Sequence, residues 1–441
     1  KECAPSNCQA KMSPMEGEKI LMSQRQLQRW HVMGLVEGGK ITLKEAAKKI
    51  GVSYRQAKRI RRALRVKGGK GIIHGNTGRA PWNRTADSIR QKVLEFSKEV
   101  YGDFNDMHFK EKLSEEQQIE LSRETVRKLR RRAGIEPKRR RRAPGHRKRR
   151  ERKAQEGAMV LWDGSPHHWL GPDHPPCCLM AAMDDSTGKL LVARFFPFEG
   201  SSGYFWLLRE MVKRYGIPLV MYHDRHGALY RNDSHWSLEE QLAGRQDPTQ
   251  VGLALEALGI ESIAALSPQA KGRIERLFGT LQDRLIAELG LEGVQSLEEA
   301  NRFLKIFIPR FNRRFAVWPR ESEKAWRKVP PELDLDRIIS FRYRSVVGND
   351  NSVRIGGLIL DLPPGPHRRS YAKAQVEVRQ LLNGTWRVYY QDQLVAKHPS
   401  TELRDPVRAL RHNRRIKGAP SEQWVYWASA PTSQSPQALG S

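Results

Sequence analysis

The sequence predicts a multidomain fold: an α-helical N-terminal region with a helix-turn-helix, an α/β core with a mixed five-stranded sheet, and a small all-β C-terminal domain. The length of 441 residues is enough for several domains. Apolar residues recur at helical spacing early in the chain, switch between strand and helix patterns in the middle, and follow strand alternation near the end. The expected parts are a disordered tail (1–22), the helix-turn-helix domain (23–67), a glycine-rich linker (68–84), a second helical domain (85–136), a basic arm (137–156), the α/β core (157–325), a small β-barrel-like domain (340–400) and a disordered tail (406–441).

The charge of the chain predicts a polyanionic partner. Formal net charge is +29 and the sequence pI is about 10.2, and such an excess of cations is typical of proteins that bind nucleic acid. No run approaches the roughly 18 apolar residues of a membrane-spanning helix, so we expect double-stranded DNA as the partner and no membrane. The four cysteines lack C-x-x-C spacing, which argues against a zinc site and fits a reducing cytoplasm. We therefore expect a cytoplasmic protein that associates with DNA.

Residues 41–65, ITLKEAAKKIGVSYRQAKRIRRALR, have the pattern of a helix-turn-helix. A short amphipathic helix precedes a turn at 51–53, and Ser53 is the predicted N-cap of a second helix. The apolar residues of that second helix face inward, which leaves its cations for solvent or for DNA phosphates. An ordinary helical hairpin with a solvated basic face is the alternative. The cations that we assign to DNA binding are Arg55, Lys58, Arg59 and Arg62.

A second helical unit and a basic arm follow. Residues 122–135, SRETVRKLRRRAGI, again begin with a capping serine and end at Ala133-Gly134, so a second DNA-binding helical domain is expected. Residues 138–153 contain eleven Lys or Arg among sixteen residues, and such a run stays extended until phosphates neutralise it. A solubilising linker is the alternative. We assign Arg139, Arg140 and Arg141 of this arm to DNA binding.

The central region has the predicted order β-β-β-α-β-α-β-α, which implies a mixed sheet with helices on its faces. A hairpin turns at 185–189, where Asp184 and Asp185 are expected as turn residues. The other strands are predicted at 158–169, 217–230 and 261–268, and the helices at 201–216, 251–260 and 267–285. Nearer the end, Asn383-Gly384 between two alternating runs predicts a β-hairpin.

Three acids occupy matching positions in this order. Asp163 is predicted to end the first strand and Asp224 the fourth, while Glu275 lies on the helix after the fifth strand. Strands that end at one edge of a sheet bring their last side chains together, and clustered carboxylates need cations such as Mg²⁺ or Mn²⁺. Two such ions, roughly 3.5–4 Å apart, can activate a water or a 3′-hydroxyl at a phosphodiester. Taken singly, each strand-end aspartate is more often a cap or turn residue.

Helical geometry selects Glu275 over a neighbouring acid. At about 100° per residue, the apolar stripe lies around Ile274, and Glu275 falls at its border beside Lys271. Asp283 falls on the opposite side and is expected to face solvent. Glu275 is therefore the acid that can reach the sheet edge.

The segments WDGS, YHDRHG and SPQAKGRIERLFGTLQDRL resemble the catalytic core of retroviral-integrase-like DDE transposases, which has a ribonuclease-H-like fold. The overall layout is most similar to bacterial insertion-sequence transposases of the ISNCY group. The resemblance implies that Asp163, Asp224 and Glu275 are the catalytic triad and bind two Mg²⁺ or Mn²⁺ ions. It also implies that Lys271 and Arg276 contact DNA. His223 or His226 could hold a phosphate or tune a metal ligand.

The implied function is a transposase that binds the terminal inverted repeats of a mobile element and catalyses metal-dependent strand cleavage and 3′-hydroxyl strand transfer, which is DNA integration or recombination. Joining two ends requires a homodimer or a larger oligomer. The second and third acids are 51 residues apart, wider than is usual in the family, and a polar insertion at 231–248 accounts for the excess. One alternative is a non-catalytic helix-turn-helix regulator or an inactive transposase remnant. Another is a ribonuclease-H-like nuclease that acts on RNA hybrids.

Overall fold

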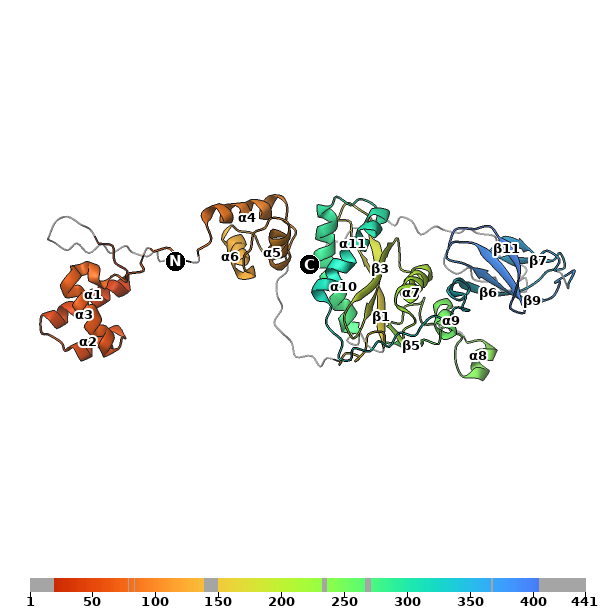
Figure 1. Ribbon diagram of the computed structural model, residues 1–441, viewed down its shortest axis with the longest axis horizontal. Helices are drawn as coiled ribbons and strands as arrows, with labels where there is room; N and C mark the ends of the chain where they lie inside the picture. Colours follow the sequence, from red (N-terminus) through yellow and green to blue (C-terminus); the bar gives the residue numbers. More distant parts are fainter. Residues whose placement is uncertain are drawn as a thin grey trace, which may run out of the picture. The chain divides into compact units, whose positions relative to one another are not determined.

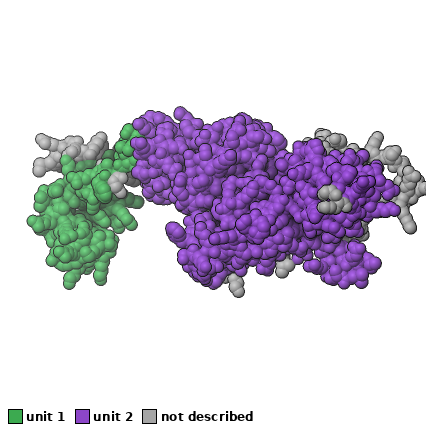
Figure 2. All heavy atoms as spheres, turned by 45° about the vertical axis from the view of Figure 1, so that its right-hand side comes forward, with its two compact units in different colours: residues 1–90 green, residues 91–441 purple. Residues whose placement is uncertain are grey.

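The computed structural model divides the chain into two compact units, residues 1–90 and 91–441, which Figure 2 colours separately. Several segments of the sequence analysis lie outside the described residues. They include both expected tails in large part, Arg139 to Arg141 of the basic arm, and residues 266–270, which contain the start of the SPQAKGRIERLFGTLQDRL segment. The residues that the structure describes are 20–77, 79–82, 84–138, 150–231, 236–265, 271–365 and 368–403.

The first unit is helical. Ser53 accepts a hydrogen bond from the backbone of Gln56 and so caps α3, while Gly51 ends α2 in the left-handed conformation with φ of 67° that a side chain would disfavour. A small core of Met33, Ala47, Ala57 and Ile60 holds the three helices together. The elements of this unit are α1 (Gln24–Glu37), α2 (Leu43–Ile50), α3 (Tyr54–Lys67) and the 3-10 helix η1 (Gly68–Ile72).

A second helical group begins at the border between the units and continues into the second. Its helices are α4 (Asp87–Glu99), α5 (Asp106–Glu115) and α6 (Arg123–Arg132). An aromatic cluster that includes Tyr101, Phe104 and Phe109 forms its core. The buried Glu111 of α5 forms ion pairs with Arg284 and Arg314, both of which belong to the α/β core. This helical group is therefore packed against the α/β core.

The α/β core contains the mixed five-stranded sheet that the sequence predicted. Its strand order is β3-β2-β1-β4-β5. The pairs β1–β2 and β2–β3 are antiparallel, whereas β1–β4 and β4–β5 are parallel. This topology fits a ribonuclease-H-like core. The strands are β1 (Val160–His167), β2 (Cys177–Asp184), β3 (Leu190–Phe196), β4 (Val220–His223) and β5 (Glu261–Ala264).

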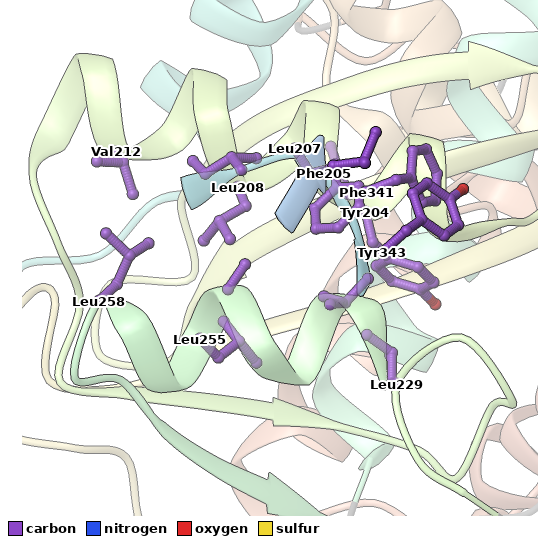
Figure 3. Close-up of a cluster of buried hydrophobic side chains, with 14 of the residues drawn as sticks. Tyr204, Phe205, Leu207, Leu208, Val212, Leu229, Leu255, Leu258, Phe341 and Tyr343 are labelled. Carbon is purple, nitrogen blue, oxygen red and sulfur yellow. The ribbon is translucent and has the colours of Figure 1, made fainter. Parts of the chain in front are cut away.

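Helices cover both faces of this sheet (Figure 1). Alternate residues of β1 point to opposite faces: Trp162 packs with α7 (Ser201–Tyr215) and α9 (Gln250–Ala257), whereas Leu161 packs with the helices of the other face. Figure 3 shows the first of these cores, where side chains of α7 meet those of α9. The helices of the second face are α10 (Gly272–Leu291) and α11 (Leu297–Phe315), and a short α8 (Leu238–Ala243) lies within the predicted insertion.

Two asparagines of α11 protect the open edge of the sheet. The side-chain amide of Asn312 accepts from the backbone N–H of Leu190 at 2.8 Å and donates to its carbonyl at 2.9 Å. Asn301 makes the same pair of bonds to Phe195, at 2.8 and 3.1 Å. These four bonds satisfy backbone groups of β3 that would otherwise offer an edge for association.

Beyond the core the chain forms two antiparallel sheets, a four-stranded one with order β11-β10-β9-β6 and a two-stranded one of β7 and β8. Phe341 of β6 meets Phe205 of α7 with ring centroids 5.1 Å apart, so this region shares the core drawn in Figure 3. The predicted Asn383-Gly384 turn joins β9 to β10. The elements are α12 (Leu335–Ile338), β6 (Phe341–Val346), β7 (Ser352–Ile355), β8 (Leu358–Asp361), β9 (Gln375–Gln380), β10 (Trp386–Tyr390) and β11 (Gln393–His398).

Among the described residues, no helix has both the length and the apolar character needed to cross a membrane.

Candidate active site

Two of the predicted acids lie where the strand order of the sheet changes direction. β1 is the central strand of the sheet. Its neighbour on one side is β2, the next strand along the chain, and its neighbour on the other side is β4. Crevices at such switch points are common ligand sites of α/β proteins. Leu161 pairs with Tyr222 in the parallel register, and continuing that register by two residues brings Asp163 level with Asp224. The topology thus places the two carboxylates at one rim.

The prediction that Asp163 ends its strand is wrong. Asp163 is the fourth residue of β1, which continues to His167. The reason is that β1 has two different neighbours: its antiparallel pairing with β2 extends to His167, whereas its parallel pairing with β4 stops at Leu161. Asp163 therefore lies at the end of one ladder and inside another. Asp224 directly follows β4, as predicted.

The Lys271 ammonium joins the two aspartates. Its Nζ lies 2.8 Å from Oδ2 of Asp163 and 3.1 Å from Oδ2 of Asp224. The Lys271 side chain is only 11% exposed and that of Asp163 14%, whereas Asp224 is 39% exposed. Lys271 is also the N-cap residue of α10. One buried cation therefore connects β1, the end of β4 and the start of α10.

The surroundings shift the pKa of each of these groups. Desolvation raises the pKa of Asp163 to about 6 in spite of its contact with Lys271. Desolvation also acts to raise the pKa of Asp224, but the hydrogen bond from the backbone of His226 and the Lys271 ammonium outweigh it and leave that pKa lowered. Burial acts to lower the pKa of Lys271, and the two carboxylates outweigh it, so the pKa of Lys271 is raised. Lys271 is charged at neutral pH, and Asp163 is the carboxyl that ionises with most difficulty.

Glu275 does not join this pair in the described structure. It lies on the first turn of α10 and is exposed, and its side chain forms no hydrogen bond or ion pair with another described residue. Consistently, the described residues contain no group of three or more His, Cys, Asp or Glu side chains arranged to hold a metal ion. The structure thus gathers Asp163, Asp224 and Lys271, and leaves Glu275 one helical turn away from Lys271 along the chain.

A fourth carboxylate that sequence reasoning missed lies beside Asp163. The Glu199 carboxylate packs against Gly164, where any side chain would collide with it, and it accepts a hydrogen bond from the buried Tyr204 hydroxyl. Its Oε1 is 3.9 Å from Nδ1 of His226. A signal was present in the sequence, because β3 runs in the same direction as β1 and Glu199 follows β3 at the same rim. The glycine of the WDGS segment makes room for this acid.

The two histidines near Asp224 differ in their surroundings. His223 is buried, its Nε2 lies 2.8 Å from the Ser262 hydroxyl, and burial lowers its pKa. It therefore links β4 to β5 as a neutral side chain. His226 is closer to the site, since its backbone N–H donates to Oδ1 of Asp224 at 2.9 Å.

Two further acids have structural roles. Asp184 accepts hydrogen bonds from the backbone of Gly157 and Thr187, at 2.9 and 2.7 Å, as expected of a turn residue. The fully buried Asp185 does more than that, because it pairs with Arg150 at the end of the basic arm and with Arg273 of α10. Asp185 thus anchors both segments to the sheet.

The expectation that Asp283 faces solvent is wrong. Its side chain is 20% exposed, it accepts a hydrogen bond from Asn105, and its carbonyl accepts one from Lys138 at 3.1 Å. The helical wheel considered α10 alone, whereas the second helical group covers that side of the helix. Geometry within one helix could not reveal this.

The cations that were assigned to DNA binding fall into distinct surroundings. Arg55, Arg59 and Arg62 are exposed on α3 and form no ion pair with another described residue, and Lys58 lies over the Tyr54 ring at 4.7 Å. Arg61 and Arg65 of the same helix instead pair with Glu37 of α1, at 2.6 and 3.0 Å. Arg276 is exposed on α10, with its Nε donating to the Gly272 carbonyl. Arg139, Arg140 and Arg141 lie outside the described residues.

Comparison with known proteins identifies the family. The chain is 39% identical over 319 residues to "Putative transposase y4bF" of Sinorhizobium fredii, an alignment that covers 72% of this chain and 68% of that protein. It is 33% identical over 358 residues to "Transposase for insertion sequence IS1202" of Streptococcus pneumoniae, covering 73% of this chain and 75% of that protein. No protein-family model matches the sequence.

Solved structures of retroviral integrases are also similar in part. A simian T-cell lymphotropic virus intasome in complex with the PP2A regulatory subunit B56 gamma matches 61% of this chain and 86% of its own, with 16% identity and a TM-score of 0.29. The HTLV-2 integrase catalytic core domain in complex with magnesium matches 34% of this chain and 84% of its own, with 16% identity and a TM-score of 0.25. At scores this low the superpositions add nothing to the assignment.

The strand order fits a ribonuclease-H-like core, and the curated relatives give the family. The chain belongs to the transposases, and the resemblance to insertion-sequence transposases that the sequence indicated is confirmed.

Proposed function

We propose that the protein binds the terminal inverted repeats of a mobile DNA element, cleaves DNA strands at its ends and joins the freed 3′-hydroxyl to target DNA. The observation that carries the proposal is the meeting of Asp163 and Asp224 around one cation at the switch point of the sheet. Membership in the transposase family supports the reaction class. Because two ends are joined together, we expect a homodimer or larger oligomer on DNA.

The donor set fits a divalent cation in part. Asp163 and Asp224 hold their oxygens on either side of a single positive charge, and carboxylate oxygens are the ligands that Mg²⁺ and Mn²⁺ prefer. Both residues would hold the metal, and Glu275 would complete the set after a movement of the first turn of α10. When bound, two such ions lower the pKa of an attacking water or hydroxyl and stabilise the leaving oxygen.

The remaining residues of the site position the acids and the DNA. The backbone of His226 fixes the orientation of the Asp224 carboxylate. Lys271 and Arg276 lie at the start of α10 and would bind DNA phosphates. The exposed cations of α3 would bind the element ends, and the basic arm would bind the adjoining duplex.

The first prediction concerns the three acids. Asp163→Asn, Asp224→Asn and Glu275→Gln should each abolish Mg²⁺-dependent cleavage and strand transfer, because each removes a charged oxygen ligand without changing size. Binding of the element ends should persist, since α3 is untouched. The measurement is a gel assay with end-containing duplexes, a supercoiled target and Mg²⁺, next to a binding assay without metal. Asp283→Asn on the same helix serves as the matched control and should retain activity.

A second candidate function is a non-catalytic DNA-binding regulator or an inactive transposase remnant. The exposed position of Glu275 favours it, because two carboxylates bridged by a lysine need no metal. The same assay separates the two functions. Wild-type protein that binds the ends but never cleaves them, in Mg²⁺ or Mn²⁺, would support the regulator; full activity of Glu275→Gln would remove only that residue from the mechanism.

A further inference from the structure

Lys271 occupies the position at which a cation is expected. Its ammonium nitrogen lies within 3.1 Å of one oxygen from each aspartate, and its side chain is almost entirely buried. Buried lysines are rare unless their charge is paired. Here the carboxylates stabilise the charge of Lys271, and the ammonium in turn stabilises the carboxylates. Without it, two carboxylates would face each other at a partly desolvated rim.

A divalent ion cannot join this arrangement while the ammonium remains. Oxygen ligands approach Mg²⁺ to about 2.1 Å and Ca²⁺ to about 2.4 Å, so an ion shared by the same two oxygens would lie in the space that Nζ occupies. Two cations that close together repel strongly at low dielectric. Binding of an ion between these two oxygens and retention of the Lys271 contact are therefore mutually exclusive.

The position of Lys271 in the fold allows it to leave. It is the N-cap residue of α10 and makes no side-chain capping bond. Gly272 follows it, and no atom of another residue approaches the place where a Gly272 side chain would stand. Glu275, one turn further on, has no partner among the described residues. At this rim the Lys271 ion pairs act in addition to the Arg273–Asp185 pair, which also attaches the first turn of α10 to the sheet.

We propose that Lys271 is an internal counter-ion that competes with divalent cations for Asp163 and Asp224. In the metal-free protein the ammonium holds the two acids together and keeps Glu275 outside the site. Loading of the site requires the Lys271 side chain to withdraw, which frees its charge for a DNA phosphate. The inference rests on the proposed function in one respect, namely that the two aspartates are the metal ligands.

The test is a titration of the purified full-length protein with MnCl₂, in which free Mn²⁺ is measured by electron paramagnetic resonance. Lys271→Met removes the competing charge and keeps the length of the side chain. We expect its dissociation constant for Mn²⁺ to be lower than that of the wild type by at least about tenfold, equivalent to about 1.4 kcal/mol. Lys189→Met is the matched control, because Lys189 forms a comparable ion pair with Glu156, at 2.8 Å, away from the site. The dissociation constant of this control should stay within about twofold of the wild-type value.

A second measurement uses the unaltered chain and does not depend on the folding of a variant. Amine-selective labelling followed by mass spectrometry should show Lys271 protected without metal and reactive with saturating Mn²⁺, while labelling of Lys189 stays constant. Equal Mn²⁺ affinity of wild type and Lys271→Met, or labelling of Lys271 that Mn²⁺ leaves unchanged, would overturn the proposal.

The Asp163→Asn variant distinguishes the possible failures. If it loses Mn²⁺ binding while wild type and Lys271→Met bind equally, the counter-ion role alone is wrong and the metal site stands. If neither wild type nor Lys271→Met binds Mn²⁺, the metal site of the proposed function fails and the counter-ion role fails with it.

Discussion

At the scale of single residues, Asp163 carries the largest electrostatic cost of the site. Its carboxyl is desolvated more than that of Asp224, and its pKa of about 6 compares with an ordinary value of 3.8. The difference corresponds to about 3 kcal/mol between protonated and ionised forms. A divalent ion would bind the ionised form, so the cost stored at Asp163 is recovered on binding. Sites of this kind commonly reduce stability in exchange for function.

This cost predicts a specific pH dependence for the metal-free protein. The folded state holds the Asp163 proton more tightly than the unfolded chain, so the contribution of Asp163 to the free energy of unfolding should fall as pH rises from about 4 to about 6 and then level off. Asp163→Asn lacks this term, and in EDTA its melting temperature should rise relative to that of the wild type over this range. The measurement is a series of thermal unfolding curves of both proteins between about pH 4.5 and 7.5.

Asp224→Asn is the matched control for that series. The pKa of Asp224 is lowered, so its contribution is fully present above the ordinary value of 3.8 and is lost only as pH falls below it. The difference in melting temperature between Asp224→Asn and wild type should therefore vary less from pH 5 to 7.5 than that of Asp163→Asn, and its remaining variation comes from the loss of the Asp224 charge beside Asp163. An equally small variation for Asp163→Asn would contradict the assigned role of desolvation.

At the scale of elements, the attachment of α11 to β3 depends on two amide side chains. Asn312→Ala would remove both bonds to the backbone of Leu190 and cost about 2 kcal/mol, because each net hydrogen bond is worth about 1 kcal/mol. We expect faster amide hydrogen exchange in the peptide that contains Leu190, measured by mass spectrometry. Asn312→Asp retains the acceptor and should have an intermediate effect. Asn301→Ala should instead increase exchange near Phe195, and exchange that is unchanged in both variants would exclude the edge-protection role.

The elements also show what the sequence could and could not predict. The five strands, their hairpin at Asp185 and the position of Asp224 followed from local patterns, because short apolar runs and turn residues act over a few positions. The end of β1 did not follow, since two neighbouring strands pair over different lengths. Asp283 and Glu199 were misjudged or missed for a related reason. Their surroundings come from segments distant in sequence, which no local periodicity encodes.

At the scale of the whole molecule, the cations behind the net charge of +29 are of two kinds. Some form buried ion pairs that hold elements together, and others are exposed. Arg284 and Arg314 are bound to Glu111 inside the contact between α5 and the α/β core, and Arg273 is bound to Asp185. Such buried pairs fix the arrangement of elements and are not available for phosphates. The free cations of α3 are exposed in the first unit, where Glu37 takes up only Arg61 and Arg65. The sequence gives the total charge, whereas the ion pairs in the structure determine which cations are available to bind DNA phosphates.

This division predicts how two charge-matched variants will differ in DNA binding. Replacing Arg55, Lys58, Arg59 and Arg62 by Gln should lower the dependence of log K on log salt concentration by about 3 to 4, since each lost phosphate contact removes about 0.9. It should also abolish preference for the element ends, because α3 is the second helix of the predicted helix-turn-helix and we propose that it reads the bases. The matched variant changes four exposed lysines of the preceding turn and α2, Lys40, Lys44, Lys48 and Lys49. It loses the same charge in the same unit and should keep the preference. Fluorescence anisotropy with end-containing and scrambled duplexes measures both the salt dependence and the preference for the ends. A range of roughly 50 to 300 mM salt is wide enough to give the slope. Equal loss of preference in both variants would show that total charge, not α3, selects the ends.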